Sequence, residues 1–227
     1  MEEKLLTVLD KIESPLSLKE LAFRSIKLAI ISNKLQAGKL YTQQGIAREV
    51  GFSKTPVREA LLDLAYQGFI EVISRKGFKV RSLTAKEIQD LYNVRIALEA
   101  MVMRSIVNIM TSEHFRYIEG LQELERKTLN DHNNYGYIAI DRELHLYMIK
   151  ITGNNYLMKA YENIRDIVDW MGLKALIKPE RLAEVMREHE KIISCLKEKD
   201  GHGAEIAMEE HIVMTRENVI RQMRPPK

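Results

Sequence analysis

The sequence has 227 residues, of which 45% are apolar and 30% charged, enough to bury one large core or two smaller ones. Aromatic residues are few, whereas Leu, Ile, Met, Glu and Lys are plentiful, which favours packed helices over a large sheet. No run of about 18 apolar residues occurs and the chain opens with acidic residues, so we expect neither a membrane span nor a signal peptide, but a cytoplasmic protein.

The net charge of +3 is unevenly distributed along the chain. Residues 1–83 contain 14 Lys and Arg against 9 Asp and Glu, a net charge of +5, and the remaining 21 basic and 23 acidic residues give −2. A basic N-terminal third is typical of a segment that meets nucleic-acid phosphates. The single cysteine, Cys195, excludes an internal disulfide and lies in a helical pattern that predicts a buried side chain.

The first two predicted helices lie in this basic third. Ser17 and Glu20 have the spacing of a capping box, and an apolar stripe at helical period continues for about five turns until Gly38. Thr42 can cap a short second helix, which ends at Gly51 because glycine enters the left-handed region freely.

A third helix is predicted to begin at a Ser53 cap, with Pro56 in its first turn. Lys54 and Arg58 are spaced i, i+4 on its outer face, with Thr55 beside them. Two helices joined by a short turn, the second with basic and hydroxyl groups at its N-terminus, match a helix-turn-helix, whose second helix enters the DNA major groove. A lone Lys/Arg pair is more often a solvated charged face, so these helices alone leave both interpretations open.

The segment after the third helix favours the DNA-binding interpretation. Residues 69–74 and 78–83 alternate like strands, and Arg75, Lys76 and Gly77 form the turn between them. A basic hairpin tip directly after a basic helix is typical of a wing that contacts phosphates. Residues 1–83 are therefore predicted to form a winged helix-turn-helix of three helices and a β-hairpin.

This segment resembles the N-terminal domain of the GntR-type regulators. The matching runs are residues 31–38, 51–61 and 68–70, followed by Gly77. The resemblance implies that eight residues contact DNA: Gln44, Ser53, Lys54, Thr55, Arg58, Arg75, Lys76 and Gly77.

Three positions depart from the pattern of that family. Lys54 stands where the family usually has arginine, Gln44 where a basic residue is frequent, and Ala37 where proline is usual. Lysine lacks the fork that bonds both acceptors of guanine, so a base contact from Lys54 is expected to be weaker or differently aimed.

From residue 84 onward the pattern is helical with short breaks. Six helices are predicted, at residues 84–109, 112–129, 135–152, 156–176, 180–199 and 203–223. The predicted fold is therefore mainly α, with the winged domain at 1–83 followed by an all-α antiparallel bundle at 84–227.

Four residues of the predicted bundle have the spacing of a metal site. Asp141 and His145 are i, i+4 and project from one helix face. His189 and His211 lie at equal distances along the chain from Asp200, so an antiparallel hairpin places them at the same level, roughly 16 Å from its turn. A single buried histidine is more often a hydrogen-bonded core residue, but three imidazoles and a carboxylate need partners. The spacing leaves a metal site and a polar core both open.

The predicted bundle resembles the helical effector domain called FCD, found in the FadR-type branch of the GntR regulators. The matching residues are 92–99, 141–145, 153–154, 188–192, 201, 207–208 and 210–212, and six helices indicate the shorter, VanR-like version. In metal-binding members an Asp and three His hold a divalent cation, which implies Asp141, His145, His189 and His211 as ligands. Zn, Ni, Mn, Co and Fe are all compatible with this set.

The predicted function is a homodimeric regulator that binds a palindromic operator on double-stranded DNA and senses a small organic acid, not an enzyme. Open coordination positions on the metal would bind the carboxylate of the effector. Arg95 is our candidate for a second group that binds this carboxylate, and the alternative is that Arg95 forms a surface salt bridge. Two other hypotheses remain: a metal-dependent hydrolase or lyase, although no HExxH motif is present, and a regulator without metal, as in acyl-CoA-sensing relatives.

Overall fold

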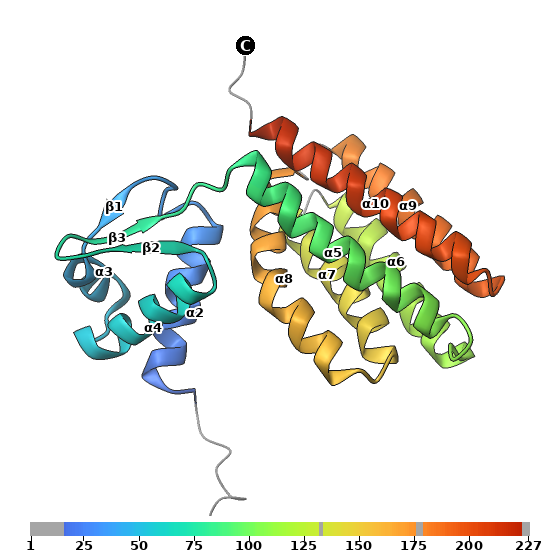
Figure 1. Ribbon diagram of the computed structural model, residues 1–227, viewed down its shortest axis with the longest axis horizontal. Helices are drawn as coiled ribbons and strands as arrows, with labels where there is room; N and C mark the ends of the chain where they lie inside the picture. The colour runs from blue at the N-terminus through green and yellow to red at the C-terminus, as the bar shows by residue number, and fades with distance from the viewer. Residues whose placement is uncertain (1–15, 132–133, 176–178, 224–227) are drawn as a thin grey trace, which may run out of the picture. The chain divides into compact units, whose positions relative to one another are not determined.

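The computed structural model describes residues 16–131, 134–175 and 179–223 (Figure 1). The chain divides into two units between Ser82 and Leu83. Within the described residues, the first unit contains three helices and a small sheet, and the second contains six helices. This arrangement confirms the predicted fold class, a winged helix-turn-helix followed by an all-α bundle.

The first helix, α2 (Leu18–Ile31), begins with the predicted capping box. The Ser17 side chain accepts a hydrogen bond from the backbone N–H of Glu20, whose carboxylate accepts one from the backbone N–H of Ser17. The helix is a turn shorter than predicted, because Asn33 takes a left-handed φ of 59°. Leu35, the last residue of the predicted stripe, is buried beyond the end of the helix.

The next two helices, α3 (Gln43–Val50) and α4 (Lys54–Tyr66), form the helix-turn-helix. Thr42 caps α3 and Gly51 ends it with a left-handed φ of 74°, both as predicted. Ser53 occupies the N-cap position of α4, but its side chain makes no capping hydrogen bond. The predicted side-chain cap is therefore wrong in this detail, and the exposed hydroxyl of Ser53 is not used for capping.

The wing consists of β2 (Ile70–Ile73) and β3 (Gly77–Val80), which are shorter than the predicted strands and pair antiparallel. A two-residue strand that the sequence did not reveal, β1 (Leu40–Tyr41), pairs with the other side of β3 and gives the order β1-β3-β2. Phe69 and Phe78 are buried under this sheet, so the wing shares the core of the unit.

Gly77 is required by this packing. Its φ is 131°, and a Cβ there would collide with the carbonyl oxygen of Tyr41 in β1. Gly51 also has a positive φ, but no atom lies within 4 Å of its Cβ position.

We expect Gly51→Ala to lower the free energy of unfolding by about 1–2 kcal/mol, the cost of left-handed backbone. Gly77→Ala should cost clearly more in urea denaturation, and equal losses would contradict this explanation.

In the second unit the described residues form six helices. They are α5 (Ala85–Ile106), α6 (Ser112–Asn130), α7 (Asn134–Ile151), α8 (Asn155–Ala175), α9 (Pro179–Lys197) and α10 (Gly201–Gln222). Thr84 and Glu87 form a capping box at the start of α5, which ends three residues before the predicted end at residue 109. Leu176, the last residue of the fourth predicted helix, lies outside the described residues.

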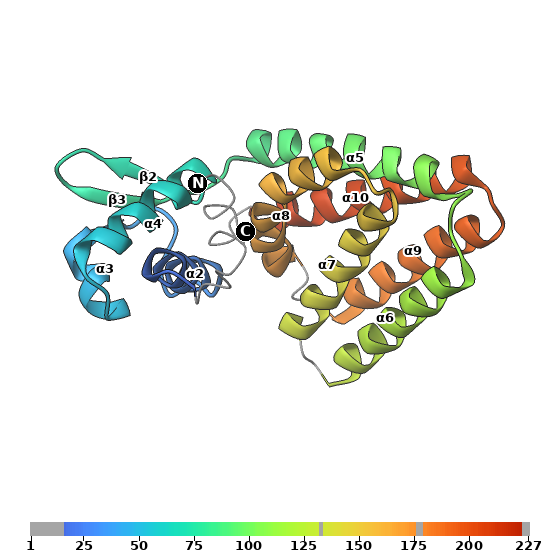
Figure 2. The same cartoon turned by 90° about the horizontal axis from the view of Figure 1, so that it is seen from below.

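The helices pack mainly against neighbours that run alongside them. Helix α10 packs along both α5 and α9, and α7 contacts α5, α6 and α8 (Figures 1 and 2). Buried side chains of α7 and α9, including Tyr137, Ile138, Leu182 and Val185, form one cluster of the core. Helices α7, α9 and α10 therefore meet inside the unit, and their inward faces carry the residues described next. Within the described ranges, no helix has the length and apolar character needed to cross a membrane.

Candidate metal centre and DNA-binding surface

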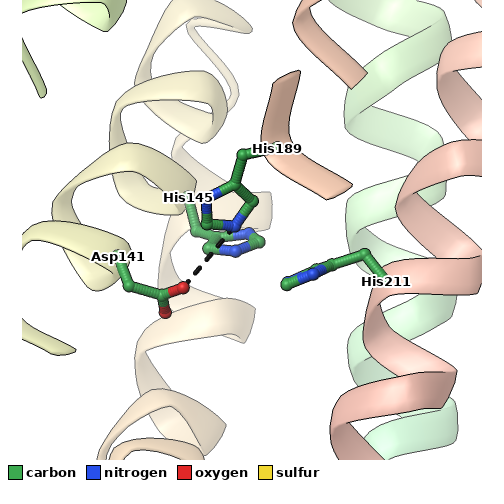
Figure 3. Close-up of side chains that lie close together, drawn as sticks. All are labelled: Asp141, His145, His189 and His211. Atoms are coloured by element: carbon green, nitrogen blue, oxygen red, sulfur yellow. Dashed lines mark ion pairs between the residues drawn. The ribbon is translucent and has the colours of Figure 1, made fainter. Parts of the chain in front are cut away.

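Four residues converge inside the second unit (Figure 3). Asp141 and His145 come from α7, His189 from α9 and His211 from α10. One ligand atom of each residue lies within 4.8 Å of those of the other three. The ring centroids are 4.8–5.4 Å apart, and each histidine is at most 2% exposed. Ligands about 2.0–2.2 Å from one cation lie roughly 3–4 Å from each other, so a small contraction would complete a coordination sphere.

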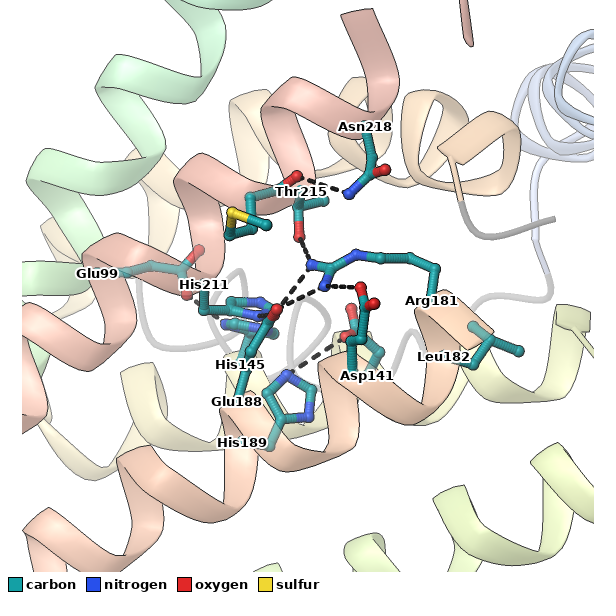
Figure 4. Close-up of polar contacts among 12 residues, drawn as sticks. Glu99, Asp141, His145, Arg181, Leu182, Glu188, His189, His211, Thr215 and Asn218 are labelled. Carbon is teal, nitrogen blue, oxygen red and sulfur yellow. Dashed lines mark hydrogen bonds and ion pairs between the residues drawn. The ribbon is translucent and has the colours of Figure 1, made fainter. Parts of the chain in front are cut away.

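Each of the three histidines has a glutamate carboxylate on its Nδ1 atom, and Figure 4 labels two of these glutamates, Glu99 and Glu188. The pairs are His145–Glu99, His189–Glu125 at 3.0 Å and His211–Glu188 at 2.7 Å. A carboxylate at Nδ1 holds a proton there and leaves the Nε2 lone pair free, which is the tautomer that metal-ligating histidines adopt. All three rings therefore direct Nε2 away from the glutamates, and Nε2 of His145 also lies 3.2 Å from Nη2 of Arg95.

The Nε2 atom of His189 shows that the site fits a cation. This atom is buried and has no hydrogen-bond partner among the described residues. The Oδ1 atom of Asp141 lies 3.5 Å away. An unpaired buried polar atom costs about 1–3 kcal/mol, and a cation between the two atoms would satisfy both.

The charges around the site also favour a divalent cation. Four carboxylates lie in this cluster, those of Glu99, Glu125, Asp141 and Glu188. Only two guanidinium groups, of Arg95 and Arg181, balance their negative charge. Buried charge without compensation is costly. Three neutral imidazoles and one divalent ion would bring this cluster to neutrality.

Two glutamates of this cluster, Glu99 and Glu188, are held in the ionised form. Burial alone would raise the pKa of Glu99, but the Arg95 guanidinium and the hydrogen-bonded imidazole outweigh it and lower the pKa to about 2. Burial is also outweighed at Glu188, where hydrogen bonds from His211 and Arg181 lower the pKa to about 2. Both carboxylates therefore remain acceptors for the imidazole N–H at neutral pH.

The pKa values of His189 and His211 are shifted in opposite directions. Burial lowers the pKa of His211 to about 4, so this ring is neutral at pH 7, as a ligand must be. Burial also acts on His189, but the charges of Glu125 and Asp141 outweigh it and raise its pKa. The position of His189 favours positive charge, which a proton or a metal ion can supply.

Arg95 is 3% exposed and lies on α5 against this cluster. Its Nε donates to Glu99 Oε1 at 2.5 Å, and its Nη2 lies 3.2 Å from Nε2 of His145. The salt bridge considered from the sequence exists, but it is buried rather than on the surface. Glu99 was not among the residues predicted for the site, although its i, i+4 spacing from Arg95 was a usable signal.

A small cavity of about 20 Å³ adjoins Asp141 and His211. It is lined by Tyr92, Arg95, Ile138, Asp141, Val168, Asp169, Val185, His211 and Thr215. The Tyr92 hydroxyl is buried and has no hydrogen-bond partner among the described residues, and burial raises the pKa of Asp169 to about 6. This volume takes about one water-sized group, so in this conformation the cavity accepts a single polar group but not a whole organic acid.

The residues predicted to contact DNA lie in the first unit. Gln44 is on α3, Lys54, Thr55 and Arg58 are in the first turns of α4 after Ser53, and Arg75 and Lys76 form the wing turn, all with exposed side chains. In Figures 1 and 2 the wing turn lies at the same end of the unit as α3. Gly77, partly buried at the start of β3, has the packing role described above.

Gln43, which was not predicted to have a role, connects the two helices of the helix-turn-helix through a hydrogen bond. The Gln43 side chain donates from Nε2 to the backbone oxygen of Lys54 at 2.9 Å. This bond ties the start of α3 to the first residue of α4. It therefore helps to set the orientation of the recognition helix.

A winged helix-turn-helix followed by a helical domain defines a DNA-binding transcriptional regulator. The family model for bacterial regulatory proteins of the gntR family matches residues 18–80, and the FCD domain model matches residues 90–214. The chain belongs to the FCD-containing GntR family of transcriptional regulators, which are not enzymes.

Named relatives agree with this assignment. The HTH-type transcriptional repressor RspR of Escherichia coli is 26% identical over 210 residues, covering 89% of this chain and 88% of that protein. The gluconate operon transcriptional repressor of Bacillus subtilis is 26% identical over 180 residues, covering 77% and 74%. The solved structure of E. coli McbR/YncC is similar in fold, with a TM-score of 0.78 at 22% identity over 92% of this chain and 100% of that one.

Proposed function

We propose that this chain is a homodimeric regulator whose DNA affinity is controlled by a small carboxylate bound at a divalent metal ion in the second unit. The observation that carries the proposal is the set of three imidazoles, each with a carboxylate on Nδ1, that converge with Asp141. The Nε2 atom of His189, which is buried without a hydrogen-bond partner among the described residues and lies 3.5 Å from Oδ1 of Asp141, supports a cation at this place.

The donor set restricts the metal to a class of ions. Three imidazole nitrogens and one carboxylate, without a thiolate, suit Zn, Ni, Mn, Co or Fe in the divalent state. Such an ion, when bound, supplies a Lewis acid with positions open to an oxygen ligand. Asp141, His145, His189 and His211 would hold it, and the three glutamates would orient the rings.

Arg95 connects the metal to the acid. Its Nη2 now lies beside Nε2 of His145, the atom proposed to coordinate the cation. When that lone pair is used for coordination, the N–H of Arg95 becomes available to an anion, for which guanidinium is well suited. Because the cavity is small, we expect the acid to enter carboxylate first and to move neighbouring side chains. The name of the Bacillus subtilis relative, a gluconate operon repressor, is consistent with a small acid.

Control of DNA binding requires that the acid favour one arrangement of a dimer over another. A ligand shifts such an equilibrium only by its difference in affinity for the two states. Two-fold symmetry of the protein would be mirrored in a palindromic operator, with half-sites about one helical turn apart. The acid would therefore change operator affinity more than the affinity for random duplex DNA.

The test uses the full-length chain, purified without chelators, and a palindromic operator selected from random duplexes. Elemental analysis should find one divalent ion per chain. Fluorescence anisotropy with a panel of small acids, such as lactate, citrate and gluconate, should identify one that shifts operator affinity about 5- to 150-fold. The shift should disappear in Asp141→Asn. Absence of stoichiometric metal, or equally tight binding to random duplexes, would contradict the proposal.

A further inference from the structure

Arg181 lies near the start of α9 and is 5% exposed, although nothing in the sequence separates it from the other arginines of the helical unit. Its guanidinium donates to both oxygens of Glu188, at 2.5 Å to Oε1 and 2.9 Å to Oε2 (Figure 4). It also donates to the Thr215 hydroxyl of α10 at 3.3 Å. This forked geometry fixes both the position and the plane of the carboxylate.

The same carboxylate oxygen serves a candidate metal ligand. Oε2 of Glu188 accepts from Nη2 of Arg181 and from Nδ1 of His211, the latter at 2.7 Å. The plane that Arg181 imposes on this carboxylate therefore sets the direction of the imidazole N–H. The opposite ring atom, Nε2, is the one that faces the proposed cation, so Arg181 acts on the site through two intermediate groups.

The arrangement occurs twice in the cluster. Arg95 donates to Oε1 of Glu99, whose Oε2 pairs with His145, and Arg181 donates to both oxygens of Glu188, whose Oε2 pairs with His211. Arg95 lies on α5 and Arg181 on α9, so the two sets of contacts do not arise from the periodicity of a single helix. In both cases an arginine contacts the glutamate that pairs with Nδ1 of a candidate ligand, which supports a role of Arg181 in orienting His211.

The orientation of Glu188 depends on Arg181 because Glu188 is the least buried of the three glutamates. Its side chain is 22% exposed and lines an open groove with Lys191, Glu210 and Met214, whereas the side chains of Glu99 and Glu125 are 2% and 1% exposed. A carboxylate that water can reach loses orientation readily unless a rigid donor holds it. Arg181 is held in this position even though its Nε is buried without a hydrogen-bond partner in the described part of the chain.

We propose that Arg181 is a positioning residue of the metal centre, which sets its affinity for divalent ions by holding Glu188 against His211. This inference rests on the metal site proposed above. Arg181 is not one of the four candidate ligands. The inference gives it a role in metal binding in addition to a role in packing α9 against α10.

The test compares Arg181→Met, which keeps length and packing volume but removes the fork, with Arg126→Met as a matched control. Arg126 is an exposed arginine of α6 that pairs with Glu123 and Glu190. Removing a group that orients a metal ligand typically weakens affinity 10- to 100-fold. We expect about a 10-fold weaker Co²⁺ affinity for Arg181→Met, measured by competition with a chromophoric chelator, and an altered Co²⁺ absorption spectrum. Arg126→Met should match the wild-type protein in both.

The outcomes separate this inference from the proposed function. If the wild-type chain binds no Co²⁺ or Zn²⁺ stoichiometrically, the metal site itself is wrong. If the wild-type chain binds Co²⁺ and folded Arg181→Met binds it with the same affinity and spectrum, Arg181 has only a packing role and the inference is overturned. Should Arg181→Met fail to fold, Arg181→Lys replaces it, since lysine keeps the charge but lacks the fork, and an unchanged spectrum would be equally contradictory.

Discussion

Replacing His189 by alanine is expected to abolish the stabilisation of the chain by divalent metal. At a free metal concentration roughly 1,000 times Kd, binding stabilises the folded wild-type protein by about 4 kcal/mol. For a chain of this size, that corresponds to a rise in Tm of roughly 8–16 °C. His189→Ala lacks one of the four proposed ligands, so added Zn²⁺ should raise its Tm by little. Differential scanning calorimetry with and without Zn²⁺ measures the difference.

The informative quantity is the metal-dependent rise and not the Tm itself. His189→Ala also leaves the buried Glu125 carboxylate without its imidazole partner, which should cost about 1–3 kcal/mol in the absence of metal. Asp141→Asn, nearly isosteric with the native side chain, provides a second variant with less packing damage. His202→Ala is the control, because His202 is exposed on α10. A full metal-dependent rise in either ligand variant would contradict the assignment of the site.

Replacing Arg58 by alanine is expected to weaken operator binding by about 1–3 kcal/mol and to relax specificity at one base pair, the loss typical of a base contact. Lys54→Ala should act differently, because lysine lacks the fork that reads guanine. It should weaken binding evenly across sequences and reduce the slope of log K against log salt by about one. Anisotropy titrations at several salt concentrations, with operator and single-base variants, separate the two effects.

Lys19→Ala is the matched control for both variants. Lys19 is a basic residue of the same unit and pairs with Asp63 near the far end of α4 from Lys54. It removes the same charge without touching the proposed recognition surface. An equal loss of affinity for Lys19→Ala and Arg58→Ala would mean that the effect reflects net charge rather than a contact, and would remove Arg58 from the recognition surface.

Local sequence signals predicted most of the fold. The capping box at Ser17 and the glycine at position 51 mark helix ends through contacts within four residues, which a sequence displays directly. Strand β1 was missed because two residues show no periodicity and the strand exists only through pairing with β3. The end of α2 was placed too late because Leu35 continues the apolar stripe, although the chain has already turned at Asn33.

The candidate site was predicted less completely than the fold. Spacing placed Asp141 and His145 on one helix face and His189 opposite His211, since helical periodicity fixes both relations. The glutamates behind the histidines were not predicted, because a glutamate in an amphipathic helix is normally solvated and its burial depends on which helices pack together. Glu125 illustrates this, since its partner His189 is 64 residues away in the sequence.

A crystal structure of the full-length protein grown with Zn²⁺ would test the metal centre most directly, through anomalous scattering at the zinc absorption edge. We predict one anomalous peak in each second unit, about 2.0–2.2 Å from Nε2 of all three histidines and from a carboxylate oxygen of Asp141. The Nδ1 atoms should keep their glutamate partners. A zinc-soaked crystal with no peak between these four residues, or with a peak on the Nδ1 side of the rings, would contradict the proposed centre.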